Sequence, residues 1–285
     1  IEEKYGFNKT TKITFLKDKI KGLLMSLIIG GFILFVSIQI YILFGANFWL
    51  WLWLFLSVFL ILTNMFYTTL IVPIFNKLSP LEEGSLKNKI EEYSKKIGYS
   101  LDKIFVIDGS KRSSKANAFF SGLGPKKTIA LFDTLIDKHE EDELVAVLAH
   151  EVGHYKKNHI KQGLLLTVLQ VGIICYVLQL CLNVPSLSYA LGASESSFHL
   201  GLIAFSFLFS PISIIIGIGM NILSRRNEYE ADNFAKESYS PESLKNALKK
   251  LSSDSLTNLY PHPLYVFVHY SHPPLLKRLE ALDRK

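Results

Sequence analysis

Residues 48–62 read FWLWLWLFLSVFLIL, and they lie within an uncharged stretch that extends from residue 46 to residue 76. A helix of about 20 apolar residues is long enough to cross a hydrocarbon core of roughly 30 Å. Three other stretches of the 285-residue chain also lack charged side chains over a comparable length. They are residues 22–44, 162–182 and 200–223. We predict four membrane-spanning helices and an integral, multi-pass membrane protein, because the core of a soluble protein rarely contains four such runs.

Lysine and arginine flank these stretches unevenly. Basic residues gather before the first stretch, after the second, before the third and after the fourth, whereas residues 45–47 and 183–199 contain none. The basic residues are Lys9, Lys12, Lys17, Lys19, Lys21, Lys77, Lys87, Lys89, Lys156, Lys157, Lys161, Arg225 and Arg226. Because loops rich in Lys and Arg stay in the cytoplasm, we predict that both termini and the middle segment face the cytoplasm. The net charge of +6 reflects this bias, and no basic–aromatic patch predicts a nucleic-acid partner.

The predicted spans divide the chain into four parts. Residues 1–75 hold the N-terminal segment and the first two spans, and residues 162–224 hold the third and fourth spans. Residues 76–161 and 225–285 are polar and long enough to fold outside the bilayer. The elements predicted in the middle part are a helix from Ser79–Glu82 to Gly98, strands at residues 103–108 and 128–133, and a helix at residues 140–158. Two or three helices, interrupted by prolines, are predicted in the last part.

The pentapeptide His150-Glu151-Val152-Gly153-His154 predicts a metal centre. Two histidines at positions i and i+4 project from one face of a helix, so their imidazoles can share one ion, typically zinc. Glu151 lies close enough to take a proton from a water that the metal activates. Gly153 has no side chain, which permits another element to approach closely. The alternative is a packed helix with two incidental histidines.

A second segment, around Glu228 and Asp232, predicts the third ligand. Catalytic zinc normally has three protein ligands and one open position. Glu228 and Asp232 share one helical face with the small residues Ala231 and Ala235, which favour tight packing against another helix. We therefore predict that Glu228 binds the metal and that Asp232 orients a ligand imidazole. Glu230 points away and is expected to be a solvated charge; the alternative is an ordinary charged segment beside a membrane span.

Three segments together resemble the motifs of one family. They are His150–His154, residues 227–235 (NEYEADNFA) and residues 270–278 (YSHPPLLKR). These segments are similar to those of the type I CAAX prenyl proteases, which are integral-membrane gluzincins related to HtpX. Residues 3–10 and 111–120 also resemble that family, so the likeness covers nearly the whole chain. It implies a multi-span α-helical membrane protein with a small α+β gluzincin-like zinc metalloprotease region, formed by residues 76–161 and 225–285, that binds one Zn²⁺ per chain.

The resemblance also implies roles for residues that spacing does not identify. Asn117 and His272 would hold the substrate backbone and stabilise the tetrahedral oxyanion, and Arg278 would support the site and help to bind the substrate. The implied substrate is a peptide or protein, and the family's lipidated substrates carry a prenylated C terminus that loses a tripeptide. We also expect residues 128–133 to pair with an extended substrate. The remaining histidines match no ligand pattern; they are His139, His159, His199, His262 and His269.

Two alternatives and one departure accompany this interpretation. An HtpX-like enzyme would degrade damaged membrane proteins, and a non-catalytic membrane protein would bind zinc without cleaving peptides. A transporter normally places ionisable residues in its spans, and the predicted spans contain no Asp, Glu, Lys, Arg or His. The family has two further spans upstream and a chamber enclosed by seven helices. We therefore expect that this chain, which opens at Ile1, lacks upstream spans or builds its chamber differently.

Overall fold

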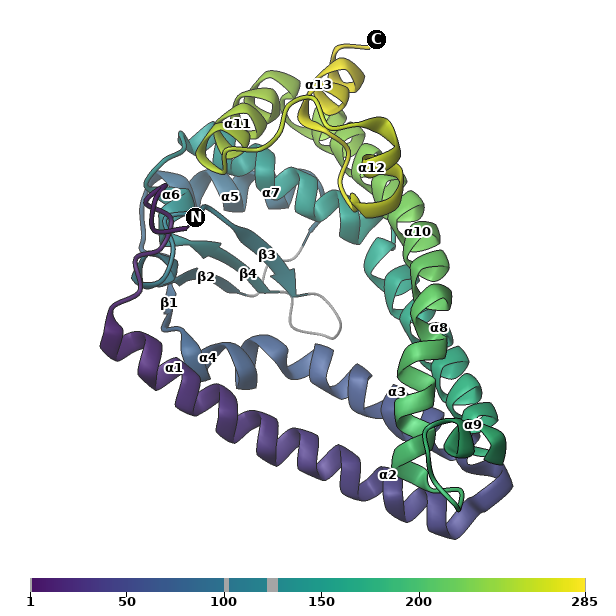
Figure 1. Ribbon diagram of the computed structural model, residues 1–285. Coiled ribbons are helices and arrows are strands. Elements are labelled where there is room, and N and C mark those ends of the chain that lie inside the picture. The colour runs from purple at the N-terminus through teal and green to yellow at the C-terminus, as the bar shows by residue number, and fades with distance from the viewer. Residues whose placement is uncertain (1, 100–102, 122–127, 285) are drawn as a thin grey trace. The chain divides into compact units, whose positions relative to one another are not determined.

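The computed structural model describes residues 2–99, 103–121 and 128–284, most of them in helices (Figure 1). The chain forms two compact units. The first, which we call the helical unit, contains residues 20–63 and 162–220. The second, which we call the α+β unit, contains residues 1–19, 64–161 and 221–285. Each unit therefore combines segments that are far apart in the sequence.

Three helical stretches among the described residues are long and apolar enough to cross a membrane, judged by length and composition. They are Lys12–Phe75, His159–Leu182 (α8) and Phe198–Ser238 (α10). The first stretch comprises α1 (Lys12–Met25), a π-helical turn (Ser26–Gly30), α2 (Gly31–Phe44), a 3-10 turn (Gly45–Asn47), α3 (Phe48–Phe66), a second π-helical turn (Tyr67–Ile71) and α4 (Val72–Phe75). Gly45 has φ 45° and ψ −108°, which is not helical, so the chain reverses there. The first stretch therefore has two arms, as the two predicted spans on either side of residues 45–47 require.

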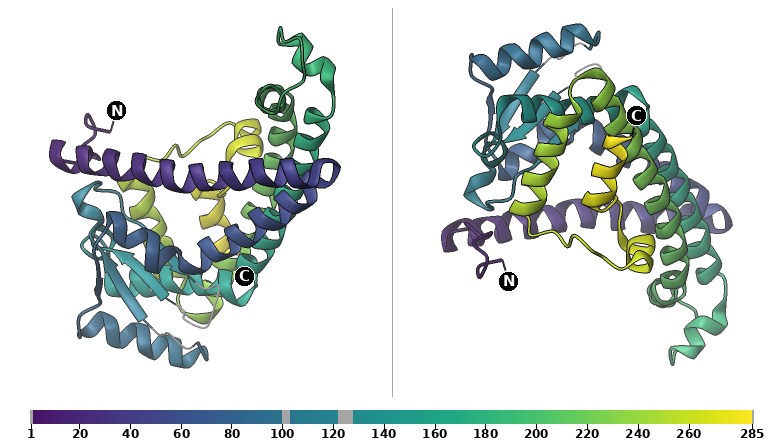
Figure 2. Two further views of the ribbon diagram at one scale, coloured as in Figure 1. Left: turned by 90° about the horizontal axis from the view of Figure 1, so that it is seen from below. Right: turned by 90° about the horizontal axis from the view of Figure 1, so that it is seen from above.

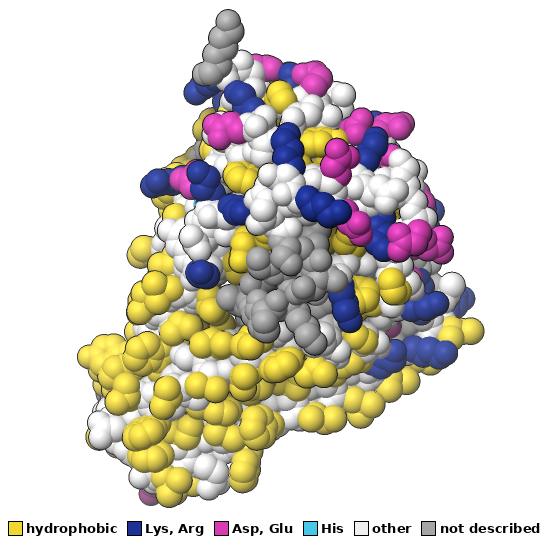
Figure 3. Space-filling model, turned by 180° about the vertical axis from the view of Figure 1, so that it is seen from behind, with side chains coloured by type: hydrophobic (Ala, Val, Ile, Leu, Met, Phe, Trp, Pro, Cys, Tyr) yellow, Lys and Arg dark blue, Asp and Glu magenta, His cyan; other side chains and the backbone are white. Residues whose placement is uncertain are grey.

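The helical unit is held together by its own small core. Phe48 and Leu52 of α3 pack with Cys175, Leu178 and Leu182 of α8. The Trp53 indole donates a 2.7 Å hydrogen bond to the Val168 carbonyl oxygen, so this partly buried polar group has a partner. Large apolar side chains such as Leu43 and Phe207 point outward and are more than two thirds exposed. Figure 3 shows such side chains covering the helical unit, while Lys, Arg, Asp and Glu gather on the α+β unit. An apolar exterior is what a lipid environment requires.

The α+β unit contains one four-stranded sheet with the order β1-β2-β4-β3. Its strands are β1 (Leu78–Pro80), β2 (Lys103–Ile107), β3 (Ala118–Ser121) and β4 (Thr128–Phe132). β2 and β4 are parallel, whereas β1 and β3 pair antiparallel with them. The two predicted strands are confirmed. The expected helix start at Ser79–Glu82 is wrong, because Leu78–Pro80 pairs with β2 and the helix α5 runs only from Ser85 to Lys96. Proline tolerates this place because β1 is an edge strand.

β4 lies inside the sheet, between β2 and β3. Both of its edges are therefore hydrogen-bonded, and the expectation that residues 128–133 pair with a substrate is wrong. β3 is the outer strand on this side of the sheet, and Asn117 directly precedes it. Within the described residues no further strand pairs with β3, so it is the edge to which an extended peptide could be added.

Helices pack around the sheet and complete the core of the α+β unit. They are α5, α6 (Asp133–Ile136), α7 (Glu141–Lys156), α11 (Pro241–Asp254), α13 (Leu275–Asp283) and the end of α10, whereas α12 (Pro263–His269) has no buried residue. Figure 2 shows α7 between α5 and α11. The buried core joins Ile104 of β2, Leu131 of β4, Leu148 of α7 and Leu244 of α11. This packing fixes α7, the predicted helix at residues 140–158, on both sides.

Candidate metal centre

The N-terminus of α7 is stabilised by a capping box formed by Glu140 and Glu143. The Glu143 carboxylate accepts a 3.0 Å hydrogen bond from the Glu140 amide, and the Glu140 side chain in turn caps the helix. Such a capping box satisfies backbone donors that a helix start leaves unpaired. Leu144, Leu148 and Val152 lie on the buried side of the helix. With this side fixed in the core, the orientation of His150 and His154 is determined.

Gly153 allows α7 to lie directly against α10. A Cβ atom at this position would lie 3.0 Å from the Ala231 Cα atom and 3.1 Å from the Phe234 Cβ atom. Ala231 and Ala235 are completely buried at the same place. The close approach that the sequence predicted for Gly153, Ala231 and Ala235 is therefore confirmed. It brings the polar face of α10 next to the two histidines of α7.

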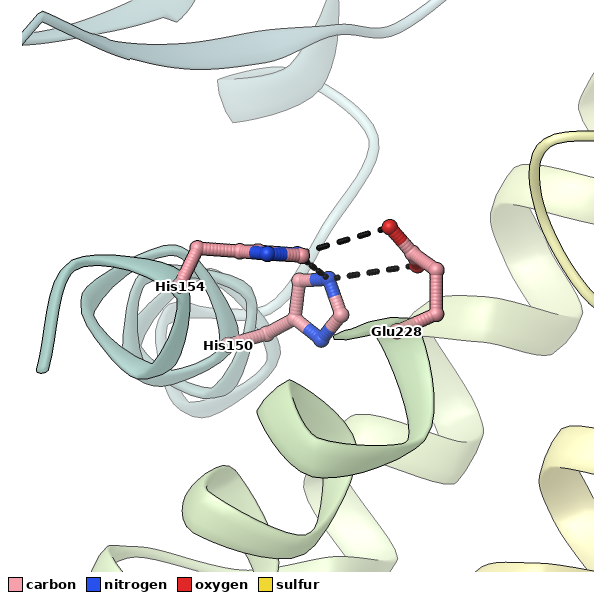
Figure 4. Close-up of side chains that lie close together, drawn as sticks. All are labelled: His150, His154 and Glu228. Atoms are coloured by element: carbon pink, nitrogen blue, oxygen red, sulfur yellow. Dashed lines mark hydrogen bonds and ion pairs between the residues drawn. The ribbon is translucent and has the colours of Figure 1, made fainter. Parts of the chain in front are cut away.

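His150, His154 and Glu228 converge at this helix crossing (Figure 4). The two histidine Nε2 atoms are 3.2 Å apart. His150 Nε2 lies 3.5 Å from Glu228 Oε2, and His154 Nε2 lies 3.4 Å from Glu228 Oε1. Tetrahedral zinc with bonds of about 2.0–2.2 Å places pairs of ligand atoms about 3.3–3.6 Å apart. The two contacts with Glu228 involve different carboxylate oxygens, and one ligand atom of each of the three residues lies within 4.8 Å of the others, which is close enough to share one ion.

The neighbouring side chains satisfy the donor atoms only in part. Glu228 Oε2 is buried, and its contacts are ion pairs at 3.5 Å with His150 Nε2 and at 3.3 Å with Arg278 Nη1 rather than hydrogen bonds of good geometry. The two Nε2 atoms face each other, so at most one of them can donate to the other. A buried polar atom without a partner costs about 1–3 kcal/mol, and a cation shared by the three side chains would satisfy them together. The residues present thus fit a metal ion.

A buried ion pair supports His150 from behind. His150 Nδ1 lies 2.9 Å from Asp232 Oδ1, and Asp232 is only 1% exposed. Arg278 of α13 donates to both oxygens of Asp232, at 2.8 and 2.6 Å. Its Nη1 also lies 3.3 Å from Glu228 Oε2. The Arg278 guanidinium therefore contacts both Asp232 and Glu228. We call the cluster of His150, His154 and Glu228 the metal group.

The charges of this cluster are set by their neighbours. Burial disfavours the protonated imidazole of His150, but hydrogen bonds with Asp232 and Glu228 outweigh this effect and raise the pKa of His150 to about 9. Burial likewise opposes the charge of Arg278, yet the bond to Asp232 and the nearby Glu228 raise the pKa of its guanidinium. A proton on His150 thus offsets part of the charge of the neighbouring carboxylates. A cation at the same place would displace it.

A cavity of about 300 Å³ opens beside the metal group. Glu151, Asn117 and His272 line it together with His150, His154, Glu228 and Arg278. Its other wall is apolar and includes Leu244, Leu248 and Leu251 of α11. The eight residues predicted for the site are thereby brought together: seven line this cavity, and Asp232 lies directly behind His150.

His272 and Asn117 reach the cavity from loops. His272 precedes Pro273 and Pro274, is 65% exposed in its side chain, and places Nε2 3.3 Å from Glu228 Oε1. Ser271 Oγ lies 3.0 Å from His272 Nδ1 and orients the ring. The Asn117 Oδ1 atom accepts a 2.9 Å hydrogen bond from the Ala118 amide. Both side chains therefore line the cavity beside the metal group.

The loop that carries Asn117 is tied to the N-terminal segment. Asn8 and Ser113 form an isolated β-bridge, and the Lys9 amide donates to the Arg112 carbonyl oxygen at 3.0 Å. The Arg112 guanidinium binds both oxygens of Asp18, at 2.7 and 2.9 Å. All these residues belong to the α+β unit. The N-terminal segment therefore helps to fix the loop that leads to Asn117.

Two residues behind His154 were missed by the sequence interpretation. His159, which matched no ligand pattern, is 7% exposed and places Nδ1 3.1 Å from His154 Nδ1. Glu230, expected to be a solvated charge, lies 3.1 Å from His159 Nε2 and binds Arg226 at 2.9 Å. The Glu230 side chain is 37% exposed, so the expected solvation holds in part, whereas its contact with His159 was not expected. Neither contact follows from helical spacing, because His159 starts a new helix after a turn at Asn158.

Comparison with known proteins identifies the family. Residues 80–285 match the sequence model of Peptidase family M48, and residues 1–77 match that described as CAAX prenyl protease N-terminal, five membrane helices. The chain therefore belongs to peptidase family M48. The prediction of a multi-span metalloprotease fold with a small α+β region is confirmed, and with it the membrane metalloprotease class.

Several relatives within this family are similar over almost all of the chain. "CAAX prenyl protease 1" of Saccharomyces cerevisiae is 40% identical over 299 residues, covering 99% of this chain and 66% of the relative. The homologue of Arabidopsis thaliana is 38% identical (99% and 67%), and that of Homo sapiens 34% (99% and 68%). The crystal structure of S. mikatae Ste24p superposes with a TM-score of 0.93 at 39% identity and covers 99% of this chain and 69% of that one. The chain spans about two thirds of the length of these relatives. These relatives support the prediction of a CAAX prenyl protease-like membrane metalloprotease and not the HtpX-like alternative.

Proposed function

We propose that the chain forms the catalytic part of a membrane-embedded zinc metalloendopeptidase that cleaves near the C terminus of prenylated proteins or peptides. The single observation that carries this proposal is the convergence of His150, His154 and Glu228 beside a cavity lined by Glu151. Two imidazoles and one carboxylate form the ligand set of many zinc peptidases, with the glutamate next to the first histidine as the base.

Zinc bound to His150, His154 and Glu228 would supply Lewis acidity and lower the pKa of a coordinated water to about 7. Glu151 accepts the proton of the attacking water and returns it to the leaving amine. His272 Nε2 and the Asn117 NH₂ group donate to the oxyanion that develops on the peptide carbonyl oxygen. Asp232, itself held by Arg278, accepts the Nδ1 proton of His150 and keeps Nε2 directed into the metal group.

The substrate peptide would bind in an extended conformation along β3. This strand is the outer strand on its side of the sheet, and Asn117 stands at its start. Backbone hydrogen bonds to an edge strand align a peptide regardless of its sequence. The apolar wall formed by Leu244, Leu248 and Leu251 would receive an aliphatic side chain next to the scissile bond. Aliphatic residues downstream of a lipidated cysteine satisfy this requirement.

We further propose that the α+β unit faces the cytoplasm. Lys156 and Lys157 at the end of α7 and Arg225 and Arg226 in α10 belong to it, and basic residues near membrane helices remain on the cytoplasmic side. Prenylated proteins would then meet the site on the side of the membrane where they are made. The lipid bilayer itself is the second partner, which the apolar exterior of the helical unit requires.

The test is a cleavage assay with the purified protein in detergent. Three substrates are compared: a farnesylated CAAX peptide, the same peptide without the lipid, and an unfolded membrane protein. Product mass spectrometry is expected to show removal of a C-terminal tripeptide from the farnesylated peptide, abolished by a zinc chelator and restored by Zn²⁺. Cleavage at many internal sites of the third substrate alone would favour the quality-control alternative. Zinc binding without any proteolysis would favour a non-catalytic protein.

A further inference from the structure

The buried His159 links His154 to Glu230, whose side chain is 37% exposed. His159 Nδ1 is 3.1 Å from His154 Nδ1, and His159 Nε2 is 3.1 Å from Glu230 Oε2. The Glu230 carboxylate is fixed in turn by Arg226, at 2.9 Å and four residues earlier on α10. His159 is 7% exposed, so water competes little for either ring nitrogen. The mechanism proposed above for the metal centre does not use His159, Glu230 or Arg226.

The backbone brings His159 to this place by a turn that few residues adopt. Asn158 has φ 60°, in the left-handed region, between the end of α7 and the start of α8. Asparagine tolerates this conformation better than most residues. The turn directs the His159 ring back against His154, with the two ring centroids 5.1 Å apart. The contact is therefore built into the fold.

The direction of each hydrogen bond in this chain follows from the position of His154. Its Nε2 atom faces His150 and Glu228, so a lone pair must be present there when it binds a metal. The proton of a neutral imidazole then resides on Nδ1 and has to be donated to His159 Nδ1. His159 consequently carries its own proton on Nε2, where the Glu230 carboxylate accepts it. Only one arrangement of protons satisfies every contact.

The two ligand histidines are thus supported in different ways. His150 donates directly to Asp232, and the carboxylate is held by Arg278. On its Nδ1 side, His154 reaches a carboxylate only through a second imidazole, and this carboxylate pairs with the exposed Arg226. Groups that accept the second ring proton of a ligand histidine orient the ring and raise its basicity. In most such sites the acceptor is a carboxylate, a carbonyl group or water.

We propose that His159 is a positioning residue that fixes the tautomer and ring orientation of His154, and that Glu230 fixes His159 in the accepting state. This inference rests on the metal-binding role proposed for His154. Glu230 lies two residues after Glu228 on the same helix. α10 therefore carries both the proposed ligand Glu228 and Glu230, the last residue in the series of contacts that orients His154.

Two substitutions of His159 separate positioning from simple space filling. In His159→Asn the side-chain oxygen can occupy the place of Nδ1 and still accept from His154. In His159→Gln the amide reaches the place of Nε2, next to Glu230, and the acceptor for His154 is lost. His159→Leu removes both contacts. His139→Asn is the matched control, since His139 is also a buried histidine, bonds to the Leu135 carbonyl oxygen and does not itself line the cavity.

The readouts are the zinc dissociation constant, measured by chelator competition, and the visible spectrum of the Co²⁺-substituted protein. We expect zinc to bind His159→Gln and His159→Leu about 10- to 100-fold more weakly than the unsubstituted protein. His159→Asn and the His139→Asn control should bind within about threefold, with an unaltered Co²⁺ spectrum. Thermal unfolding identifies any variant that has lost its fold.

Two results would overturn the proposal. One is wild-type zinc affinity and Co²⁺ spectrum in folded His159→Leu. The other is an equal loss in His159→Asn and His159→Gln, which would mean that His159 only fills space. If the unsubstituted protein itself binds no zinc, the proposed function fails instead, so the two failures are distinguishable.

Discussion

Gly153 of α7 and Ala231 of α10 touch so closely that a Cβ atom on Gly153 would lie 3.0 Å from the Ala231 Cα atom. This contact connects two distant parts of the sequence, because one helix carries both histidines and the other carries Glu228. The separation of the two helices thereby sets the distance from the imidazoles to the carboxylate. The metal centre depends on the absence of a side chain at one position.

Gly153→Leu should therefore separate the helices and weaken the metal group. Overpacking of this kind typically costs about 1–3 kcal/mol of stability, and we expect at least a tenfold lower zinc affinity. Gly163→Leu in α8 is the control, because a Cβ atom there meets nothing within 4 Å. Chelator competition and thermal unfolding measure both effects. Unchanged zinc binding in a folded Gly153→Leu protein would refute the link between helix spacing and the ligand set.

Glu151→Gln should retain zinc and lose cleavage. Glu151 lines the cavity but is not one of the three converging ligands, so the amide leaves the metal group intact. It cannot take a proton, and general acid–base catalysis is typically worth 10²- to 10⁴-fold in rate. Zinc content and turnover of the farnesylated peptide are measured on the same preparation. Near-normal turnover would exclude Glu151 as the base.

Arg278→Leu should destabilise the α+β unit strongly. It leaves the buried carboxylates of Asp232 and Glu228 without their shared cation, and breaking a buried ion pair on one side costs about 3–5 kcal/mol. Replacing Asp232 by leucine as well should recover part of this stability, since the charges of Arg278 and Asp232 are then both absent and only the Glu228 carboxylate remains. The double variant should still bind zinc about 10- to 100-fold more weakly, because His150 has lost its acceptor. Equal zinc affinity in the double variant and the unsubstituted protein would show that Asp232 does not contribute to zinc binding.

Arg112→Leu should raise KM severalfold without changing the zinc content. The Arg112–Asp18 pair holds the loop that leads to Asn117, and both side chains are roughly three quarters buried. Lys115→Gln is the control in the same loop, because its ion pair with Glu2 is more exposed and exposed pairs contribute little. Steady-state kinetics with the farnesylated peptide measure the effect. If KM rises equally in both variants, the Asp18 contact has no special role.

The sequence predicts the parts of the site that depend on helical periodicity. His150 with His154, and Glu228 with Asp232, each lie four residues apart, and the small residues Gly153 and Ala231 indicated where their helices meet. Side chains that reach the site from loops follow no such rule. Asn117 and His272 were identified only through their resemblance to a family.

Other features depend on tertiary contacts that no local pattern encodes. His159 contacts His154 across a left-handed turn, so no periodicity relates the two residues. Leu78–Pro80 forms a strand because β2 pairs with it, although Ser79-Pro80 is typical of a helix start. β4 looked like a free strand because β3, which covers its outer edge, is too short to stand out in the sequence.

Zinc K-edge X-ray absorption of the purified protein tests the central claim most directly. The account predicts one zinc ion per chain with two imidazole nitrogens and additional oxygen ligands at about 2.0–2.2 Å. The imidazole signal should disappear from His150→Ala together with the zinc. A metal-loaded protein without histidine ligands, or a Glu228→Ala variant with an unchanged coordination shell, would contradict it.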